Sequence, residues 1–198
     1  MESISLTTFA DFMNKSGTPK MGVVREWKYR GEYDPATDYW KRMRDGIVAV
    51  HQKERGLDTL QRIVERATPT KRENYSTIAK AYKKWIGRRS MPWFVPTKQD
   101  WESGKVSVQV NPELGLVIDG GRHLIKLYFK DDALPKNRAA LVLQMMHMAC
   151  GPHVKAGTIM AVLDVRKCRL HTSENPVAEH GAQLAGEAAY WAAVYPSV

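Results

Sequence analysis

Cysteine is scarce in this sequence, because its 198 residues include only Cys150 and Cys168. So few thiols exclude a disulfide-stapled fold and predict that both are reduced. Long apolar runs are also missing, since none approaches the roughly 20 residues that cross a bilayer. Residues 1–12 lack the basic-then-apolar order of a signal peptide. These absences predict a cytoplasmic protein with no membrane partner.

Several motifs with a known chemistry are missing too. The sequence contains no GxGxxG, no P-loop, no GxSxG and no HExxH. It therefore lacks the signatures of dinucleotide-binding proteins, P-loop nucleotide hydrolases, α/β-hydrolases and zinc peptidases.

Charge is the most informative feature that is present, because it is unevenly distributed. Residues 1–98 contain 20 Lys and Arg against 11 Asp and Glu, whereas residues 99–198 contain ten of each. The net charge of +9 thus belongs to the first half. Such asymmetry predicts that the first half meets a polyanion, most often DNA or RNA. A protein that is simply basic is the alternative.

The first hundred residues predict a string of helices. One begins at Thr18-Pro19 and ends at Gly31, a longer one runs from Asp34-Pro35 to Gly56, and a short one ends at Thr68-Pro69. The fourth covers residues 70–89, where Thr70 and Glu73 have the spacing of a capping box.

Cations fill the C-terminal half of this fourth helix, next to aromatic side chains. The mixture suits phosphates and bases together. The simpler alternative is that the cations only complement the helix dipole. The predicted nucleic-acid-binding residues, two of them on the preceding long helix, are Lys80, Lys83, Lys84, Trp85, Arg88, Arg89, Arg42 and Arg44.

The second half predicts strands in KVSVQV, LGLVID and RHLIKLYFK, with Gly120-Gly121 as the tight turn between the last two. A buried helix over 134–148, a central strand in TIMAVLDV and an alanine-rich helix over 176–194 follow. The predicted fold class is α/β (α+β): a helical N-terminal half followed by a mixed αβββαβ sheet. A basic helical region, 1–69, and an α/β core, 70–198, either form separate domains or pack as one.

Polar side chains converge on the predicted hairpin. With Gly120-Gly121 as the turn, Glu113 and Lys126 are diagonal neighbours on one face, and Asp119 shares that face. Carboxylates suit Mg²⁺, and a lysine suits a phosphate. The alternative is a solvated cross-strand ion pair worth about 0.2 to 1 kcal/mol.

The order of elements over residues 70–170 resembles the restriction-endonuclease-like PD-(D/E)XK nuclease fold, especially its RecB-like branch. The matching positions are Glu73 on the preceding helix, Glu113 or Asp119 on the second strand, Lys126 on the third and Gln144 on the next helix. The resemblance implies that Glu113, Asp119 and Lys126 are catalytic. Glu113 and Asp119 would hold Mg²⁺, which activates water and neutralises charge on the scissile phosphate.

Two positions depart from the family pattern. The acid expected two residues before the lysine is Leu124, and the aromatic expected four residues after the glutamine is Met148. The missing carboxylate removes a metal ligand. Two functions therefore stay open: a Mg²⁺-dependent phosphodiester hydrolase, and an inactive relative that only binds DNA or RNA.

A non-enzymatic adaptor is the alternative from another class. Its basic face would bind an acidic protein partner, and it would use the Trp93-Phe94 loop and the alanine-rich last helix. That helix also suits a homo-oligomer, since small side chains allow helices to approach closely.

Two CxxH pairs, Cys150 to His153 and Cys168 to His171, have ligand types that suit zinc. About eight strand residues lie between them and span roughly 26 Å. The pairs are therefore predicted at opposite ends of the sheet, and zinc is not expected.

Overall fold

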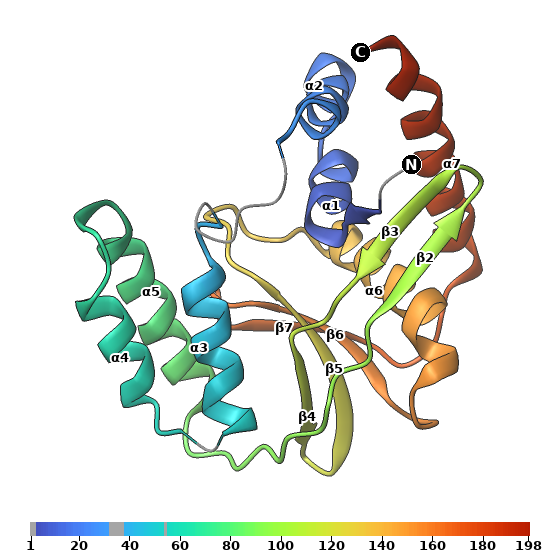
Figure 1. Cartoon of the computed structure of the whole chain (residues 1–198). Coiled ribbons are helices and arrows are strands. Elements are labelled where there is room, and N and C mark those ends of the chain that lie inside the picture. The colour runs from blue at the N-terminus through green and yellow to red at the C-terminus, as the bar shows by residue number, and fades with distance from the viewer. Residues whose placement is uncertain (1–2, 32–37, 54) are drawn as a thin grey trace.

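The computed structural model describes residues 3–31, 38–53 and 55–198. A helical first half is followed by a region of strands and helices (Figure 1), which confirms the predicted α/β class and the helical N-terminal half. The helices described are α1 (Leu6–Asn14), α2 (Gly17–Lys28), α3 (Lys41–Gln52), α4 (Asp58–Glu65), α5 (Pro69–Ile86), α6 (Lys136–Cys150) and α7 (Ala178–Val194). The strands are β1 (Ile4–Ser5), β2 (Gln99–Ser103), β3 (Val106–Val110), β4 (Leu114–Ile118), β5 (Gly121–Tyr128), β6 (Ile159–Asp164) and β7 (Arg169–Ser173).

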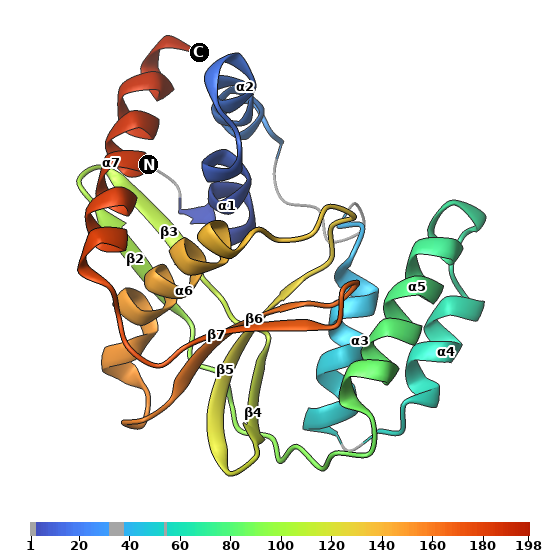
Figure 2. The same cartoon turned by 180° about the vertical axis from the view of Figure 1, so that it is seen from behind.

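The larger sheet has the strand order β4-β5-β6-β7. Strands β5 and β6 are parallel and are connected through α6, whereas the outer pairs are antiparallel. Leu124 and Val162 pack on one face with α1, α6 and α7, and Ile125 and Leu163 pack on the other with α3, α4 and α5 (Figure 2). Both faces are buried, which explains why β5 and β6 read as nearly continuous apolar runs.

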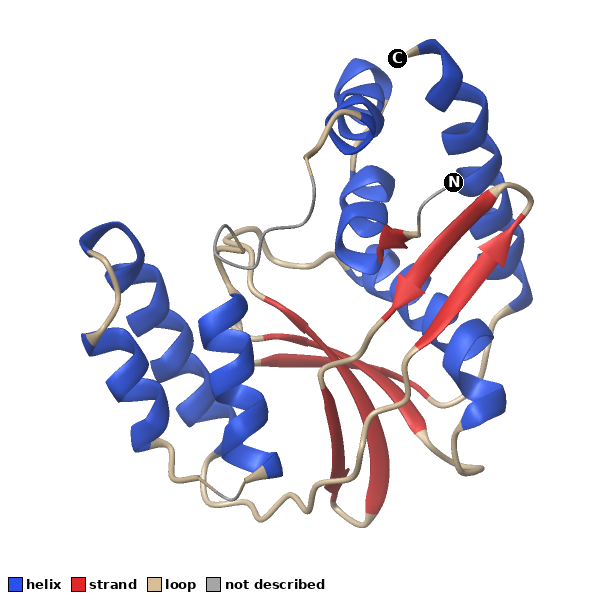
Figure 3. Ribbon diagram, in the orientation of Figure 1, coloured by secondary structure: helices blue, strands red, loops and turns tan. Residues whose placement is uncertain are grey.

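A second, three-stranded sheet has the order β1-β3-β2 (Figure 3). The sequence predicted that the KVSVQV strand would join the nuclease-like sheet beside the hairpin. This was wrong, because the strand, β3, pairs with β1 and β2 instead. Strands β1, β2 and β7 were not predicted from the sequence. β1 has two residues, and β2 and β7 are largely polar, so none of them has a clear alternating apolar pattern.

The predicted helices of the first half form, with shifted ends. Helix α5 begins at Pro69 with Thr68 as its N-cap, so the predicted cap at Thr70 was wrong; Pro69 is the first helical residue, where its missing N–H costs nothing. The predicted start of the long helix at Asp34-Pro35 lies outside the described residues, and α3 begins at Lys41. The boundary at residue 69 stays a prediction.

None of the helices in the described part of the chain is long and apolar enough to span a membrane.

A buried His–Tyr hydrogen bond connects α3 to α5. His51 Nε2 lies 2.6 Å from Tyr82 Oη, and both residues are buried. Burial lowers the pKa of His51, although a hydrogen bond with the backbone of Met91 opposes the change. The unfolded chain therefore binds a proton more readily than the folded chain as the pH falls below about 6.5.

We expect the free energy of unfolding to fall as the pH is lowered from 7.5 towards 5, because protonation of this histidine favours the unfolded chain. Urea denaturation at each pH measures the slope. The variant His51→Gln should have a shallower slope than the wild type, with His153→Gln, an exposed histidine, as the control. Equal slopes for wild type and His51→Gln would show that His51 does not contribute.

Candidate functional site

The hairpin turn consists of Asp119 and Gly120, not of Gly120 and Gly121 as the sequence predicted. Ile118 pairs with Gly121, and the two turn residues have φ of 49° and 83°. Two positive φ values suit a type I′ turn, and Asp-Gly is among its preferred sequences. The turn moves by one residue and the strand pairing therefore moves by two, so Lys126 lies opposite Glu113 and not diagonal to it.

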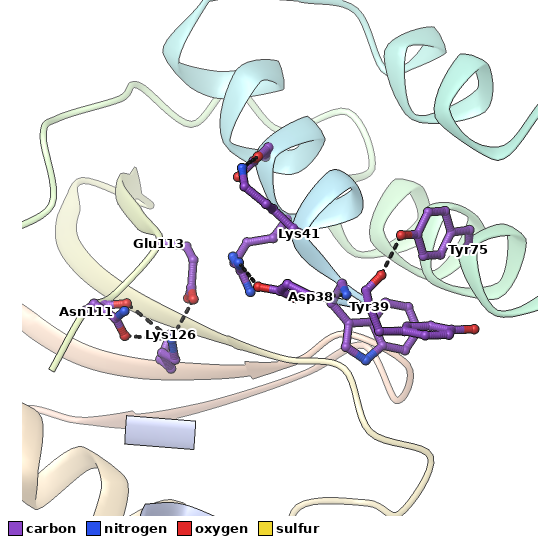
Figure 4. Close-up of polar contacts among 10 residues, drawn as sticks. Asp38, Tyr39, Lys41, Tyr75, Asn111, Glu113 and Lys126 are labelled. Carbon is purple, nitrogen blue, oxygen red and sulfur yellow. Dashed lines mark hydrogen bonds and ion pairs between the residues drawn. The ribbon is translucent and has the colours of Figure 1, made fainter. Parts of the chain in front are cut away.

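Lys126 and Glu113 form a nearly buried ion pair, and each side chain is 10% exposed. Lys126 Nζ donates to Glu113 Oε1 at 2.6 Å, to Asn111 Oδ1 at 3.1 Å and to the Asn111 carbonyl at 3.2 Å. Glu113 Oε2 accepts from the backbone N–H of Leu127 at 2.8 Å. Figure 4 shows Asn111 and Glu113 pointing at Lys126. An ammonium has three donors, so these three contacts satisfy it.

This group of Asn111, Glu113 and Lys126 is named the clamp. Asn111 and Glu113 lie in the link between β3 of the small sheet and β4 of the large one. Lys126 lies in β5. The clamp therefore ties the connection between the two sheets to the centre of the larger one.

The clamp lies against a cleft of about 1030 Å³. Residues of α1, α3, the 93–98 loop and the end of β5 line this cleft. Its charged lining residues are nearly balanced in number: Arg30, Arg44, Lys98, Lys126 and Lys130 against Asp11, Asp38, Asp45 and Glu113.

Arg44 is the predicted nucleic-acid-binding residue that lies in the same cleft as the clamp. The Arg44 guanidinium donates to Asp38, which is labelled in Figure 4, at 2.7 Å, and the Arg44 side chain is 28% exposed. The pKa of Arg44 is raised: burial opposes its charge, but Asp38, Glu113 and Asp45 outweigh burial. The arginine is therefore held as a cation within the field of three carboxylates.

Asp119 is not brought to the clamp. It is an exposed turn residue, and the five residues of β4 lie between it and Glu113, so six residue steps along the strand separate the two by about 20 Å. Both oxygens of Glu113 are already engaged. The two carboxylates therefore do not fit the Mg²⁺ site that the nuclease resemblance implies. In residues 3–31, 38–53 and 55–198, no three His, Cys, Asp or Glu side chains are grouped to hold a metal ion.

The other two family positions also lie elsewhere. Gln144 is buried, and its Oε1 accepts from the backbone N–H of Val177, the N-cap of α7, at 2.7 Å. Glu73 is exposed in the first half of α5. Neither of them lines the cleft.

The predicted basic residues of α5 are exposed, whereas its tryptophan is not. Trp85 is 8% exposed and packs against Tyr82, with the Arg89 guanidinium 5.2 Å from its ring centre. The ring belongs to the core beneath α5, and its role in binding nucleic acid stays a prediction. The exposed cations predicted here and on α3 are Lys80, Lys83, Lys84, Arg88, Arg89 and Arg42.

The excess charge is more localised than the sequence analysis recognised. Residues 41–89 span α3, α4 and α5 and contain 14 Lys and Arg against five Asp and Glu. The remaining residues contain 16 of each, so this stretch, named the basic unit, carries the whole net charge of +9. The three helices stand together beside the larger sheet (Figure 1).

The Trp93-Phe94 loop lies along the edge of β4. Phe94 N–H donates to the Gly115 carbonyl at 2.8 Å, Val117 N–H donates to the Pro92 carbonyl at 2.9 Å, and Trp93 bridges to Leu116. The segment therefore covers an edge that would otherwise expose unpaired backbone groups. The sequence does not predict this strand-like pairing clearly, because two prolines flank the aromatic pair.

Sequence reasoning missed Asn111 and Lys98, and it considered Trp93 only as part of a loop that docks a protein partner. Asn111 completes the clamp, and the other two line the cleft. Of these residues, only Trp93, in the apolar Trp-Phe pair, stood out in the sequence as a candidate for binding a partner.

The strand between the two CxxH pairs is present as β6. Cys150 donates to the carbonyl of Thr97, and Cys168 donates to that of Ala81. Burial raises the pKa of Cys150 to about 11, so this thiol is held protonated.

Comparison with known proteins gives no match: no family model, no curated protein and no solved structure is significantly similar to this chain. Fold and site together define it as a mixed α/β protein with a basic helical unit and a cleft lined by both charged and apolar side chains.

Proposed function

We propose that this protein binds DNA or RNA through the basic unit without cleaving it. The observation that carries the proposal is that residues 41–89 hold the whole net charge of +9, with Lys80, Lys83 and Lys84 exposed on one helix. Clustered cations bind a polyanion by releasing its condensed counterions.

An inactive relative of the PD-(D/E)XK nucleases is favoured over a Mg²⁺-dependent hydrolase. Lys126 uses its three donors on Asn111 and Glu113, and Glu113 uses its oxygens on Lys126 and the backbone of Leu127. Asp119 is too distant to supply a second carboxylate. The clamp thus supports a structural role.

The test is a binding titration with labelled single-stranded DNA, duplex DNA and RNA, in EDTA and in Mg²⁺, at several salt concentrations. We expect the affinity to fall tens- to thousands-fold over a few-fold rise in salt, with the polymer intact in both buffers. Cleavage that needs Mg²⁺ would contradict the non-hydrolytic function. No complex with any polymer would contradict the proposal and favour the adaptor with an acidic protein partner.

We expect the double variant Lys80→Glu and Lys84→Glu to bind at least about tenfold more weakly and to lower the slope of log affinity against log salt by about two, since each lysine contributes about one. Both side chains are exposed, so the fold should be unaffected. The matched control is Lys105→Glu with Lys155→Glu, two exposed lysines outside the basic unit with the same change in net charge. Equal weakening by both doubles would mean that only overall charge matters.

A further inference from the structure

The cleft carries aromatic side chains that the basic unit's phosphate contacts do not use. Trp40 and Trp93 line it, and both are half-buried. Trp40 stacks on Phe129, with ring centres 5.3 Å apart and planes at 18°. The Trp93 backbone is fixed by its bridge to Leu116. Both indoles are therefore held by the fold at the cleft wall.

The charges of the cleft do not suit a run of phosphates. Three of its cations are already in ion pairs: Arg44 with Asp38, Lys126 with Glu113 and Lys130 with Asp11. Since each pair is locally neutral, the cleft attracts a polyanion weakly compared with the basic unit. Its two half-buried indoles suit the face of a flat ring instead.

The position of the cleft connects it to the basic unit. Helix α3 is the first element of that unit, and Trp40 directly precedes it, while Arg44, Asp45 and Val48 of α3 line the cleft. Figure 1 places α3 at the side of the basic unit that faces the sheets. The cleft therefore borders the basic unit along α3.

We propose that the cleft binds unpaired nucleobases of the nucleic acid held by the basic unit, with Trp93 as a stacking surface. The inference rests on the proposed function and specifies its ligand as single-stranded. Bases in a duplex are paired and stacked on one another, so only an unpaired base offers its face to an indole. The volume of about 1030 Å³ is at the upper end of small-ligand pockets, which suits a short segment.

The test is Trp93→Ala, measured by fluorescence polarisation with a labelled single-stranded oligonucleotide and a duplex of the same length. We expect the variant to bind the single strand about five- to 150-fold more weakly, the range for losing one aromatic stacking partner, and the duplex as the wild type does. Trp93→Phe should retain most of the single-strand affinity. Tyr29→Ala, which removes an aromatic side chain that is 70% exposed and does not line the cleft, is the matched control and should change neither affinity.

The outcomes separate this inference from the proposed function. Unchanged single-strand affinity in Trp93→Ala, alongside weaker binding by the Lys80 and Lys84 double variant, would overturn the inference and leave the function standing. No binding of any polymer by the wild type would overturn both. If Trp93→Ala does not fold, Trp93→Leu replaces it, because leucine keeps an apolar side chain without the aromatic face. A Trp93→Leu protein that binds the single strand as tightly as Trp93→Phe would overturn the inference.

Discussion

Replacing Glu113 by glutamine is expected to lower the free energy of unfolding by about 3 kcal/mol, because the change leaves the Lys126 ammonium without a counter-charge in a nearly buried position. The glutamine can still accept from Leu127, so the effect isolates the lost charge. Urea denaturation of the variant and the wild type measures it.

Two further variants identify the cause. Asp45→Asn removes another carboxylate of the same cleft, but its pair with Lys41 is exposed and should be worth less than about 1 kcal/mol. The double variant Glu113→Gln with Lys126→Met leaves no buried charge, so it should recover much of the stability. A double variant no more stable than Glu113→Gln would exclude the unpaired ammonium as the cause.

Replacing Gly115 by alanine is expected to lower the free energy of unfolding by about 3 kcal/mol, since overpacking of this kind typically costs 1 to 3. A Cβ at this position would lie 2.3 Å from the carbonyl oxygen of Phe94 and 2.7 Å from its ring. Because the oxygen is backbone, the 92–94 segment must move away from β4. Its two hydrogen bonds to β4 would weaken with it.

Urea denaturation gives the loss of stability, and hydrogen exchange at the Phe94 amide gives the loss of pairing. The matched control is Gly186→Ala in α7, where nothing lies within 4 Å of the added Cβ. That change should stabilise the helix by roughly 0.5 to 1 kcal/mol, because alanine has the higher helix propensity. A Gly115→Ala protein as stable as the wild type would contradict the pairing of Pro92–Phe94 with β4.

The candidate site was predictable in its central pair and not in its chemistry. Alternation along two strands joined by a short turn brought Glu113 and Lys126 together, and they are in contact. The family resemblance gave Asp119 a metal-binding role beside Glu113, but a hairpin of this length holds its turn far from its open end. It also assigned a role to Gln144, which instead binds the start of α7.

Periodicity along the sequence by itself determined the α/β class, the helical first half and the strand TIMAVLDV, since local side-chain spacing fixes which face of each element is apolar. The concentration of cations before residue 98 is likewise a property of the sequence alone. Only the tertiary structure decided which sheet β3 joins and that Trp85 is buried. It also decided that Arg44 shares a cleft with the clamp and that the three donors of Lys126 are satisfied. These outcomes depend on contacts between residues far apart in the sequence, such as Lys126 with Asn111, which no local pattern encodes.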